Sequence, residues 1–374
     1  MNLKVLDGRS IVFLAKNNRW HDPAWPGLVF FPSLLAYHLS RENRVLWVGG
    51  LTRNPVGALN LREVHPNLFA FTPWFTGKRH EYVHLGRLNA FLYAVQVRWR
   101  MRQLKMLDPI FWAAQIPCAD VLPFLSHGTW IYSVGDVLLG SIDAEFLRQV
   151  AAILVLSEIT FEELFPKYPT KTLLYSTGVD ADLWMRGGSH CEEPSDLVSI
   201  PRPRVGFVGN ITEERVDFPL LREVALKNPA VSFVFIGPFE PGIPQRWFPN
   251  MPNVYLLGAK PYTTLPMYVQ GLDVCLIPYK LNAFNLGANP NKIFEYFALG
   301  KPVITTPLPS VMRFRPWLYV AENAQEFHGW LARILGTGEP ERLRQERVGI
   351  AREHSPQAVL ERIDRFLQNL APQE

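Results

Sequence analysis

The chain is poor in cysteine, the residue that builds disulfide frameworks and most structural zinc sites. Its 374 residues include only Cys118, Cys191 and Cys275, an odd number with no short spacing between any two of them. Disulfide-rich domains need several cysteine pairs, and structural zinc sites need cysteines or histidines a few residues apart. The sequence therefore predicts no disulfide framework and no metal site, and it favours a reducing, cytoplasmic compartment.

Long apolar runs are also absent. No stretch approaches the roughly 20 apolar residues that a membrane-spanning helix needs. The apolar run near the N-terminus, Ile11–Ala15, is interrupted by Lys16, and no cleavage site follows it. We therefore expect neither a signal peptide nor a transmembrane helix.

Charge is sparse and nearly balanced. Charged residues make up 19% of the chain, and 38 Lys and Arg against 34 Asp and Glu give a net charge of +4. A dedicated nucleic-acid-binding protein would carry a denser basic surface, whereas a mildly basic chain suits an anionic small ligand or an acidic membrane surface. No G-x-G-x-x-G follows a predicted strand, which disfavours a dinucleotide oxidoreductase.

What the chain does have is a globular composition and two rounds of strand and helix signals. Hydrophobic residues reach 48%, and 374 residues exceed one ordinary core, so two domains are expected. Nearly continuous apolar strands separated by helices are typical of parallel sheets covered on both faces. In the first half we expect a helix at 31–39 and strands at 10–15, 44–48, 67–72, 109–113, 129–133, 152–156 and 171–175. In the second half we expect strands at 204–208, 231–236, 254–257, 274–277 and 302–305, and helices at 218–227, 265–270, 292–299 and 356–370.

Residues 186–203 separate the two rounds. They are rich in Gly, Pro and polar residues and show no periodicity, so we interpret them as a linker. The prediction is an N-terminal domain over 1–185, a C-terminal domain over 204–354, and an amphipathic helix over 355–374 that can pack back on the N-terminal domain.

The most informative segment is Asn289–Pro307. It predicts a loop, a helix ending near Gly300, and a buried strand. Lys292 and Glu295 share one face of that helix, which begins where open α/β sheets bind ligands. Free backbone N–H groups and Lys292 could hold a diphosphate, and Glu295 could accept hydrogen bonds from ribose hydroxyls. Taken alone, such a pair is more often an ordinary surface pair.

The same segment resembles the donor-site signature of GT-B glycosyltransferases, P-x-K-x-x-E-Y-x-A-x-G-K-P-V. Residues 203–310 as a whole resemble bacterial family 4-like (group 1) transferases of the teichuronic acid biosynthesis kind, and the N-terminal half resembles them loosely. The matching signature residues are Pro290, Lys292, Glu295, Tyr296, Ala298, Gly300, Lys301, Pro302 and Val303. The resemblance implies two Rossmann-like, doubly wound domains facing across a cleft, with the nucleotide sugar on the C-terminal domain and the acceptor on the N-terminal one. It implies no cofactor and no metal.

The resemblance also implies roles for other residues of the C-terminal half. Gly209 and Asn210 would let the backbone approach the pyrophosphate, because glycine has no Cβ. Arg215 falls where relatives place a diphosphate-binding arginine, although the lysine usual a few residues later is missing. The resemblance thus implies donor binding by Gly209, Asn210, Arg215, Gly237, Pro238, Pro290, Asn291, Lys292 and Glu295. Many retaining relatives carry a second glutamate eight positions before Glu295, where this chain has Gly287, so the stereochemical outcome stays open.

Two N-terminal residues are candidates for work on the acceptor. Asp136 follows a predicted strand and is our candidate general base, and His21, after the first strand, could contact the acceptor or a phosphate. A turn-capping aspartate and a plain loop histidine are the simpler interpretations. Asp180 and Asp182 spell D-x-D, which binds metal in the other glycosyltransferase fold; here we favour a structural role.

Residues 78–105 combine basic and aromatic side chains in one predicted helix. Such a helix could lie on an anionic membrane surface near a lipid-linked acceptor, or simply present a solvated basic face.

The sequence as a whole predicts a glycosyltransferase that moves a sugar from a UDP- or GDP-sugar to a hydroxyl of a lipid-linked or cell-surface polysaccharide precursor. We expect it in the cytoplasm, peripheral on the inner face of the membrane if 78–105 binds lipid. A non-catalytic nucleotide-sugar-binding module and a sugar-nucleotide epimerase are the alternatives. The donor sugar, the nucleotide, the acceptor and the oligomeric state are not determined by the sequence.

Overall fold

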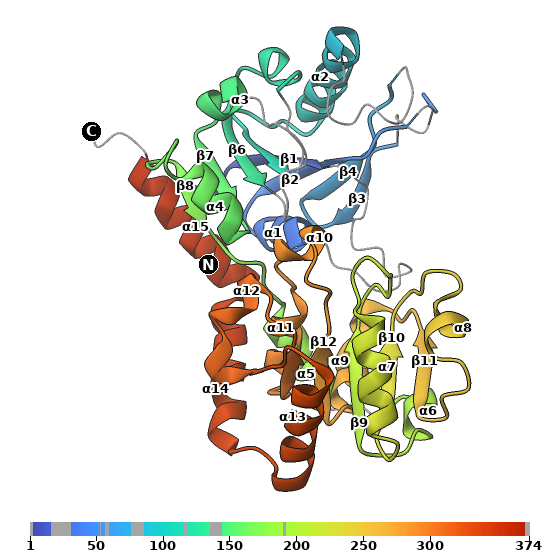
Figure 1. The fold of residues 1–374 in the computed structure, drawn as a ribbon. Helices are drawn as coiled ribbons and strands as arrows, with labels where there is room; N and C mark the ends of the chain where they lie inside the picture. The colour runs from blue at the N-terminus through green and yellow to red at the C-terminus, as the bar shows by residue number, and fades with distance from the viewer. Residues whose placement is uncertain are drawn as a thin grey trace. The chain divides into compact units, whose positions relative to one another are not determined.

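The structure is a computed structural model that describes residues 3–15, 31–52, 54–56, 60–75, 86–114, 119–134, 144–189 and 192–370. These residues divide into two compact units (Figure 1). One holds the described residues up to Ser176 together with those from Val359 on, and the other spans Thr177–Ala358.

The N-terminal unit is built on an eight-stranded sheet with the order β3-β4-β2-β1-β5-β6-β7-β8. Every neighbouring pair is parallel except β3 and β4, which are antiparallel. Its strands are β1 (Ser10–Ala15), β2 (Arg44–Gly49), β3 (Arg62–His65), β4 (Leu68–Phe71), β5 (Ile110–Ala114), β6 (Thr129–Val134), β7 (Ala152–Val155) and β8 (Thr172–Leu174). Its helices are α1 (Phe31–Leu39), α2 (Gly86–Gln103), α3 (Ala144–Gln149), α4 (Glu158–Leu164) and α15 (Pro356–Leu370).

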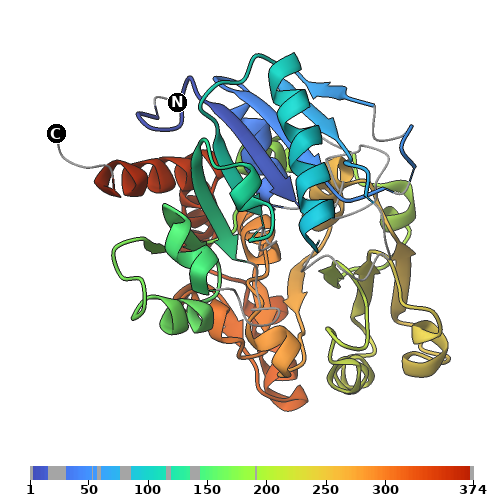
Figure 2. The same ribbon diagram turned by 90° about the horizontal axis from the view of Figure 1, so that it is seen from above.

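Two helices of this unit, α2 and α15, are held to the rest of it in different ways (Figure 2). α2 packs Ala90, Ala94 and Val97 into the same apolar cluster as inward-facing residues of β1, β2 and β5. α15 is attached through the buried Asp364, whose carboxylate accepts hydrogen bonds from the backbone N–H groups of Lys4, Val5 and Leu6 at 2.8 to 2.9 Å. Three charge-assisted hydrogen bonds to one carboxylate fix the first described turn of the chain to the last helix.

The C-terminal unit is built on a six-stranded parallel sheet with the order β11-β10-β9-β12-β13-β14. Its strands are β9 (Arg204–Val208), β10 (Ser232–Ile236), β11 (Val254–Gly258), β12 (Val274–Ile277), β13 (Val303–Thr305) and β14 (Tyr319–Val320). Numbered within the unit, this is the order 3-2-1-4-5-6 of the doubly wound Rossmann fold. The strand order reverses between β9 and β12, and such a switch point is where open α/β sheets bind ligands, at the carboxyl ends of the strands.

Helices cover both faces of this sheet. α7 and α13 pack together, while α5, α9, α11 and α14 form a second, connected group. The helices are α5 (Ala181–Ser189), α6 (Ser195–Val198), α7 (Phe218–Lys227), α8 (Ile243–Trp247), α9 (Leu265–Gln270), α10 (Ala283–Leu286), α11 (Lys292–Ala298), α12 (Pro309–Met312), α13 (Ala324–Thr337) and α14 (Glu341–Glu353).

The predicted linker differs from the structure. The described residues of 186–203 belong to the C-terminal unit and contain the end of α5 and the whole of α6. Leu197 is fully buried and Ile200 nearly so, both in the core cluster that holds the strands of this unit. Two apolar anchors three residues apart are enough to seat one helical turn, although they produce no periodicity in a polar sequence.

Candidate functional site

Two glycines bring backbones together at the switch point. Gly209 follows β9 with φ of 156°, and Gly237 follows β10 with φ of 143°. A Cβ at Gly237 would overlap the carbonyl oxygen of Gly209, and a Cβ at Gly209 would overlap Cε of Lys292. Only glycine permits both the backbone conformation and the close approach, so each position needs that residue.

Lys292 and Glu295 form a buried pair beside Gly209. Both side chains are only 9% exposed, with 4.0 Å between Nζ of the lysine and Oε2 of the glutamate. Oε2 is buried and has no hydrogen-bond partner among the described residues. Burial raises the pKa of Glu295, and the charge of Lys292 opposes that rise. The pair is therefore no surface salt bridge: it is a desolvated lysine and carboxyl in loose contact, with capacity left to bind a ligand.

The helix that carries this pair is short and held against the end of β9. The hydroxyl of Tyr296 accepts a hydrogen bond of 3.0 Å from the backbone N–H of Val208. The residue before the helix, Asn291, accepts hydrogen bonds through its carbonyl oxygen from Phe294 and Glu295, while its buried side-chain Oδ1 has no partner in the described chain. Because α11 has only seven residues, we attribute its attraction for anions mainly to the Lys292 side chain rather than to a helix dipole.

The remaining predicted donor residues lie on the loops around this pair. The carbonyl of Pro238 accepts a hydrogen bond from Ile211, and the carbonyl of Pro290 accepts one from Ile293, so both prolines shape turns. Asn210 is half-buried in the loop after β9. The guanidinium of Arg215 lies over the rings of Tyr279 and Phe284, two contacts that sequence reasoning missed because they cross about 70 residues.

Other predictions fall elsewhere. Asp136 and His21 lie outside the described residues. Asp180 accepts a hydrogen bond from the backbone of Leu183 in the first turn of α5, which agrees with the structural role we favoured for the D-x-D motif. Gly287 follows α10 as its C-cap, with φ of −87°, and no carboxylate stands there.

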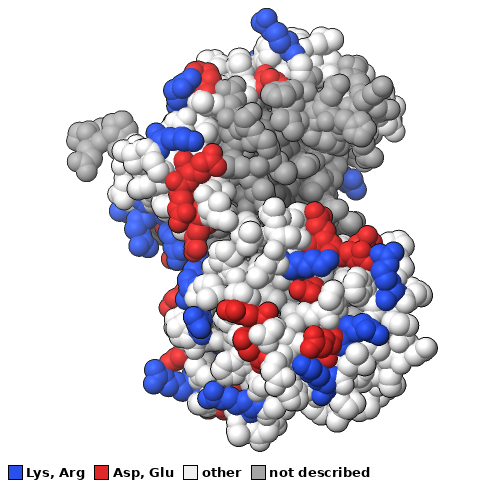
Figure 3. Space-filling view, in the orientation of Figure 1, with Lys and Arg blue, Asp and Glu red and all other residues white. Residues whose placement is uncertain are grey.

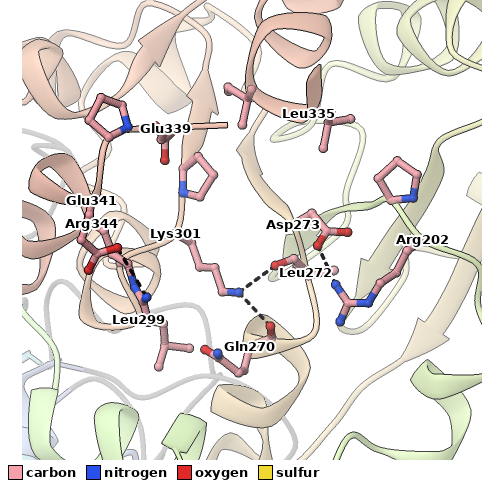
Figure 4. A pocket seen from close by; sticks show the side chains of 15 residues that line it. Arg202, Gln270, Leu272, Asp273, Leu299, Lys301, Leu335, Glu339, Glu341 and Arg344 are labelled. Atoms are coloured by element: carbon pink, nitrogen blue, oxygen red, sulfur yellow. Dashed lines mark hydrogen bonds and ion pairs between the residues drawn. The ribbon is translucent and has the colours of Figure 1, made fainter. Parts of the chain in front are cut away.

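A pocket of about 680 Å³ lies at the opposite, amino edge of the same sheet, below the starts of β9, β12 and β13 (Figure 4). Its charged groups already have partners. Arg202 pairs with Asp273 at 2.5 Å, Arg344 with Glu341 at 3.7 Å, and Nζ of Lys301 donates to the carbonyls of Gln270 and Leu272. These charged groups are therefore paired with one another or with backbone carbonyls. The lining does not include the predicted donor residues.

Comparison with known proteins bears directly on this site. Residues 202–337 match the family model described as Glycosyl transferases group 1. This part of the chain is therefore similar to group 1 glycosyltransferases. The matched range contains the switch point, both glycines and the Lys292–Glu295 pair.

A curated relative extends the match. Over 168 residues the chain is 29% identical to the putative teichuronic acid biosynthesis glycosyltransferase TuaH of Bacillus subtilis, which covers 43% of this chain and 42% of that protein. The alignment thus spans less than half the length of the curated relative.

Solved structures match both units of the chain. Anabaena Alr3699/HepE in complex with UDP aligns over 96% of this chain and 99% of its own, with a TM-score of 0.68 at 16% identity. Trehalose 6-phosphate synthase from Burkholderia multivorans gives 0.67 at 12% identity, and sucrose-phosphate synthase from Thermosynechococcus elongatus gives 0.63 at 14%, each over 97% of this chain and 99% of its own. These similarities confirm the predicted GT-B fold.

Proposed function

We propose that this protein transfers a sugar from a nucleoside diphosphate sugar to a hydroxyl group of an acceptor. The observation that carries the proposal is the buried Lys292–Glu295 pair beside Gly209, at the sheet's switch point, with one carboxylate oxygen unpartnered in the described structure. Burying a lysine and a carboxyl 4.0 Å apart without a direct hydrogen bond costs free energy. A ligand that brings phosphate oxygens to Lys292 and sugar hydroxyls to Glu295 recovers that cost.

The chemistry follows from these groups. The acceptor oxygen bonds to the anomeric carbon of the donor as the bond from that carbon to the diphosphate breaks. Lys292 stabilises the negative charge that grows on the leaving diphosphate, which is the kind of interaction that contributes most to such reactions. Glu295 holds ribose hydroxyls, Gly209 and Asn210 line the pyrophosphate, and Gly237 and Pro238 lie on the base side.

The acceptor side of the proposal rests on the N-terminal unit. If the reaction inverts the anomeric centre, Asp136 takes the proton of the acceptor hydroxyl, and His21 contacts the acceptor. Asp136→Asn should then abolish transfer while leaving nucleotide binding unchanged. Transfer at the wild-type rate would remove Asp136 from the mechanism.

The identities of donor and acceptor are proposed from relatives. HepE is described in complex with UDP and glucose, so we propose a UDP-sugar ahead of a GDP-sugar. TuaH is named for teichuronic acid biosynthesis, so we propose a polysaccharide precursor as the acceptor.

The first experiment is a thermal-shift titration with UDP, GDP, ADP and TDP. A nucleotide that binds only the folded state raises the melting temperature by mass action. We expect one nucleotide to raise it in wild type and not in Lys292→Ala. Lys227→Ala is the matched control, because Lys227 on α7 forms only exposed contacts, an ion pair with Glu223 and a hydrogen bond to Gln325. No shift with any nucleotide, or an equal shift in Lys292→Ala, would count against the donor site.

A turnover assay separates the competing functions. The absence of a carboxylate at Gly287 is the observation that keeps a non-catalytic nucleotide-sugar-binding module as a second candidate. Binding without donor hydrolysis or transfer to any acceptor would support that module. Interconversion of the donor with no acceptor present would support an epimerase instead.

We also propose that α2 brings the enzyme to an anionic membrane surface. Leu88, Phe91, Val95 and Trp99 repeat at helical spacing and are 40% to 66% exposed. The helix has no acidic residue, and Arg87, Arg98 and Arg102 are exposed beside the apolar stripe. Apolar side chains flanked by cations match an anionic interface. Among the helices that the structure describes, none combines the length and hydrophobicity needed to span a bilayer.

One residue of the basic helix departs from the prediction. Arg100 is only 3% exposed, and its guanidinium lies over the rings of Trp99 and Phe71, so it does not join the basic face.

Vesicle co-sedimentation tests the membrane proposal. We expect binding to phosphatidylcholine vesicles containing phosphatidylglycerol, weaker binding to phosphatidylcholine alone, and loss of binding in Phe91→Ser/Trp99→Ser. Leu226→Ser, at an exposed apolar residue of α7, is the control. Equal binding by the double variant would contradict the role of α2, and no binding by wild type would remove it.

A further inference from the structure

Two segments at the carboxyl edge of the C-terminal sheet are joined by hydrogen bonds. One is 209–217, after β9, and the other is 279–287, after β12. The residue that joins them is Asn285, which is fully buried. Its side-chain Nδ2 donates to the carbonyls of Glu214, Arg215 and Lys280 at 3.2, 3.0 and 3.0 Å. The backbone N–H of Lys280 also donates to the carbonyl of Arg215 at 2.9 Å, so the second segment fixes the backbone of this arginine.

The second segment also holds the arginine side chain. The guanidinium carbon of Arg215 lies 5.1 Å from the ring centre of Tyr279 and 4.9 Å from that of Phe284. Cation–π contact of this kind restrains the guanidinium while leaving its edge donors free. No carboxylate of the described residues forms an ion pair with Arg215. Phe284 is 41% exposed, and its ring lies against the arginine at the surface of the unit.

A chain of neighbouring side chains links the restrained arginine to Gly209 and Lys292. The ring of Phe207, near the end of β9, would contact a Cβ at Gly209 and lies 6.0 Å from the ring of Tyr279. Lys292 runs over Gly209, and Arg215 lies over Tyr279. Two cations thus lie near the end of β9, Lys292 on α11 and Arg215 on the loop that follows β9.

We propose that Phe284 and Asn285 are positioning residues that hold the Arg215 guanidinium ready to bind the second phosphate of the donor. The inference rests on the proposed donor function and deepens it. Lys292 binds one phosphate as a point charge, and Arg215 binds the other through its planar fork of donors. Preorganisation matters here because an unrestrained arginine loses side-chain entropy when it binds.

The test measures dissociation constants of UDP and UMP by isothermal titration calorimetry. If the thermal-shift assay selects another base, the corresponding di- and monophosphate are used. We expect Arg215→Ala to weaken UDP binding about 10- to 100-fold and UMP binding much less, because UMP lacks the second phosphate. Phe284→Ala and Phe284→Leu should each weaken UDP binding by about two- to fivefold. Phe284→Tyr, which keeps an aromatic ring, should bind UDP as tightly as wild type.

A double-mutant cycle tests whether Phe284 acts through Arg215. In the Arg215→Ala background, Phe284→Ala should have no further effect on UDP binding. Asn285→Ser should reproduce the selective loss of UDP binding if it folds. Because Phe284 is exposed, its variants keep the test decisive if Asn285→Ser does not fold.

Several outcomes overturn the inference and remain distinguishable from failure of the donor site. If Lys292→Ala weakens UDP binding and Arg215→Ala does not, the donor site stands and Arg215 has no part in it. An equal effect of Phe284→Ala in both backgrounds, or no restoration by tyrosine, would remove the positioning role. If no nucleotide binds wild type, the donor proposal fails and this inference fails with it.

Discussion

The two edges of the C-terminal sheet hold their buried charges in different ways. At the amino edge, Arg347 is fully buried and forms two hydrogen bonds of 2.6 and 2.5 Å to the carboxylate of Glu339. It donates a further bond of 2.7 Å to the carbonyl of Trp317. At the carboxyl edge, Lys292 and Glu295 stand 4.0 Å apart, and no carboxylate of the described chain pairs with Arg215.

This difference separates charges that complete their hydrogen bonds inside the fold from charges that we propose bind a ligand. A buried ion pair contributes to folding only if its hydrogen bonds are completed inside the protein. Completed networks have nothing left to offer a ligand, whereas incomplete ones do. On the face of the C-terminal unit seen in Figure 3, Lys and Arg lie beside Asp and Glu.

The largest effect should come from breaking the completed network. Arg347→Met should lower the free energy of unfolding by about 3 to 5 kcal/mol, because it leaves Glu339 without its cation. Urea denaturation measures the loss, and the nucleotide affinity of the folded fraction should be unchanged. A loss below about 1 kcal/mol would show that the pair is not structural.

Breaking the Lys292–Glu295 pair should affect nucleotide affinity more than the free energy of unfolding. Lys292→Met keeps the methylene packing over Gly209 but removes the charge. We expect nucleotide affinity to fall about 10- to 100-fold, equivalent to about 1.5 to 3 kcal/mol. The free energy of unfolding should change by less than about 1 kcal/mol at neutral pH, since Glu295 can take up a proton. A large loss of stability with intact binding would reverse the assignment.

The pH dependence of Glu295 sharpens the comparison further. Burial raises the pKa of its carboxyl in the folded state, so the folded protein binds a proton that the unfolded chain has released. Stability that depends on this proton is present below the ordinary pKa of glutamate and is lost as pH rises through the raised value. Glu295→Gln should therefore be more thermostable than wild type above that window and similar to it below.

The same substitution should weaken nucleotide binding several-fold, because a neutral amide is a poorer acceptor for ribose hydroxyls than a carboxylate. Melting curves across pH, with and without nucleotide, measure both effects. A variant that is less stable than wild type throughout would contradict the raised pKa.

The sequence predicted the positions of helices and strands better than it predicted the burial and contacts of their side chains. The helices 218–227 and 265–270 and the strand 274–277 have the predicted bounds, because buried parallel strands and capped helices leave strong local patterns. β3 was missed, because a four-residue edge strand with one apolar residue among Arg, Glu and His has no apolar signature. The sequence placed Lys292 and Glu295 on one face of a helix but could not tell that this face is buried.

Contacts between distant segments were beyond the sequence. Asn285 lies about 70 residues from Arg215 along the chain, and nothing local to either residue indicates the contact. Asp136 and His21 remain predictions from the sequence, because both lie outside the described residues. A family signature indicates which residues are candidates for donor binding. The segments that hold those residues in place can be identified only from the fold.

The smallest effect should come from Lys301, the signature lysine at the amino edge. Its ammonium lies at the end of α9 and donates to the carbonyls of Gln270 and Leu272 at 2.7 and 2.8 Å, a favourable place for a cation. Burial nevertheless lowers the pKa of Lys301, so desolvation offsets part of that gain. Lys301→Met should therefore lower the free energy of unfolding by only about 0.5 to 1 kcal/mol and leave nucleotide affinity unchanged. Urea denaturation and calorimetry on the same samples measure the two quantities. If Lys301→Met weakened nucleotide binding as much as Lys292→Met, a lysine already hydrogen-bonded within the fold would also contribute to nucleotide binding. The distinction between structural charges at the amino edge and ligand-binding charges at the carboxyl edge would then not hold.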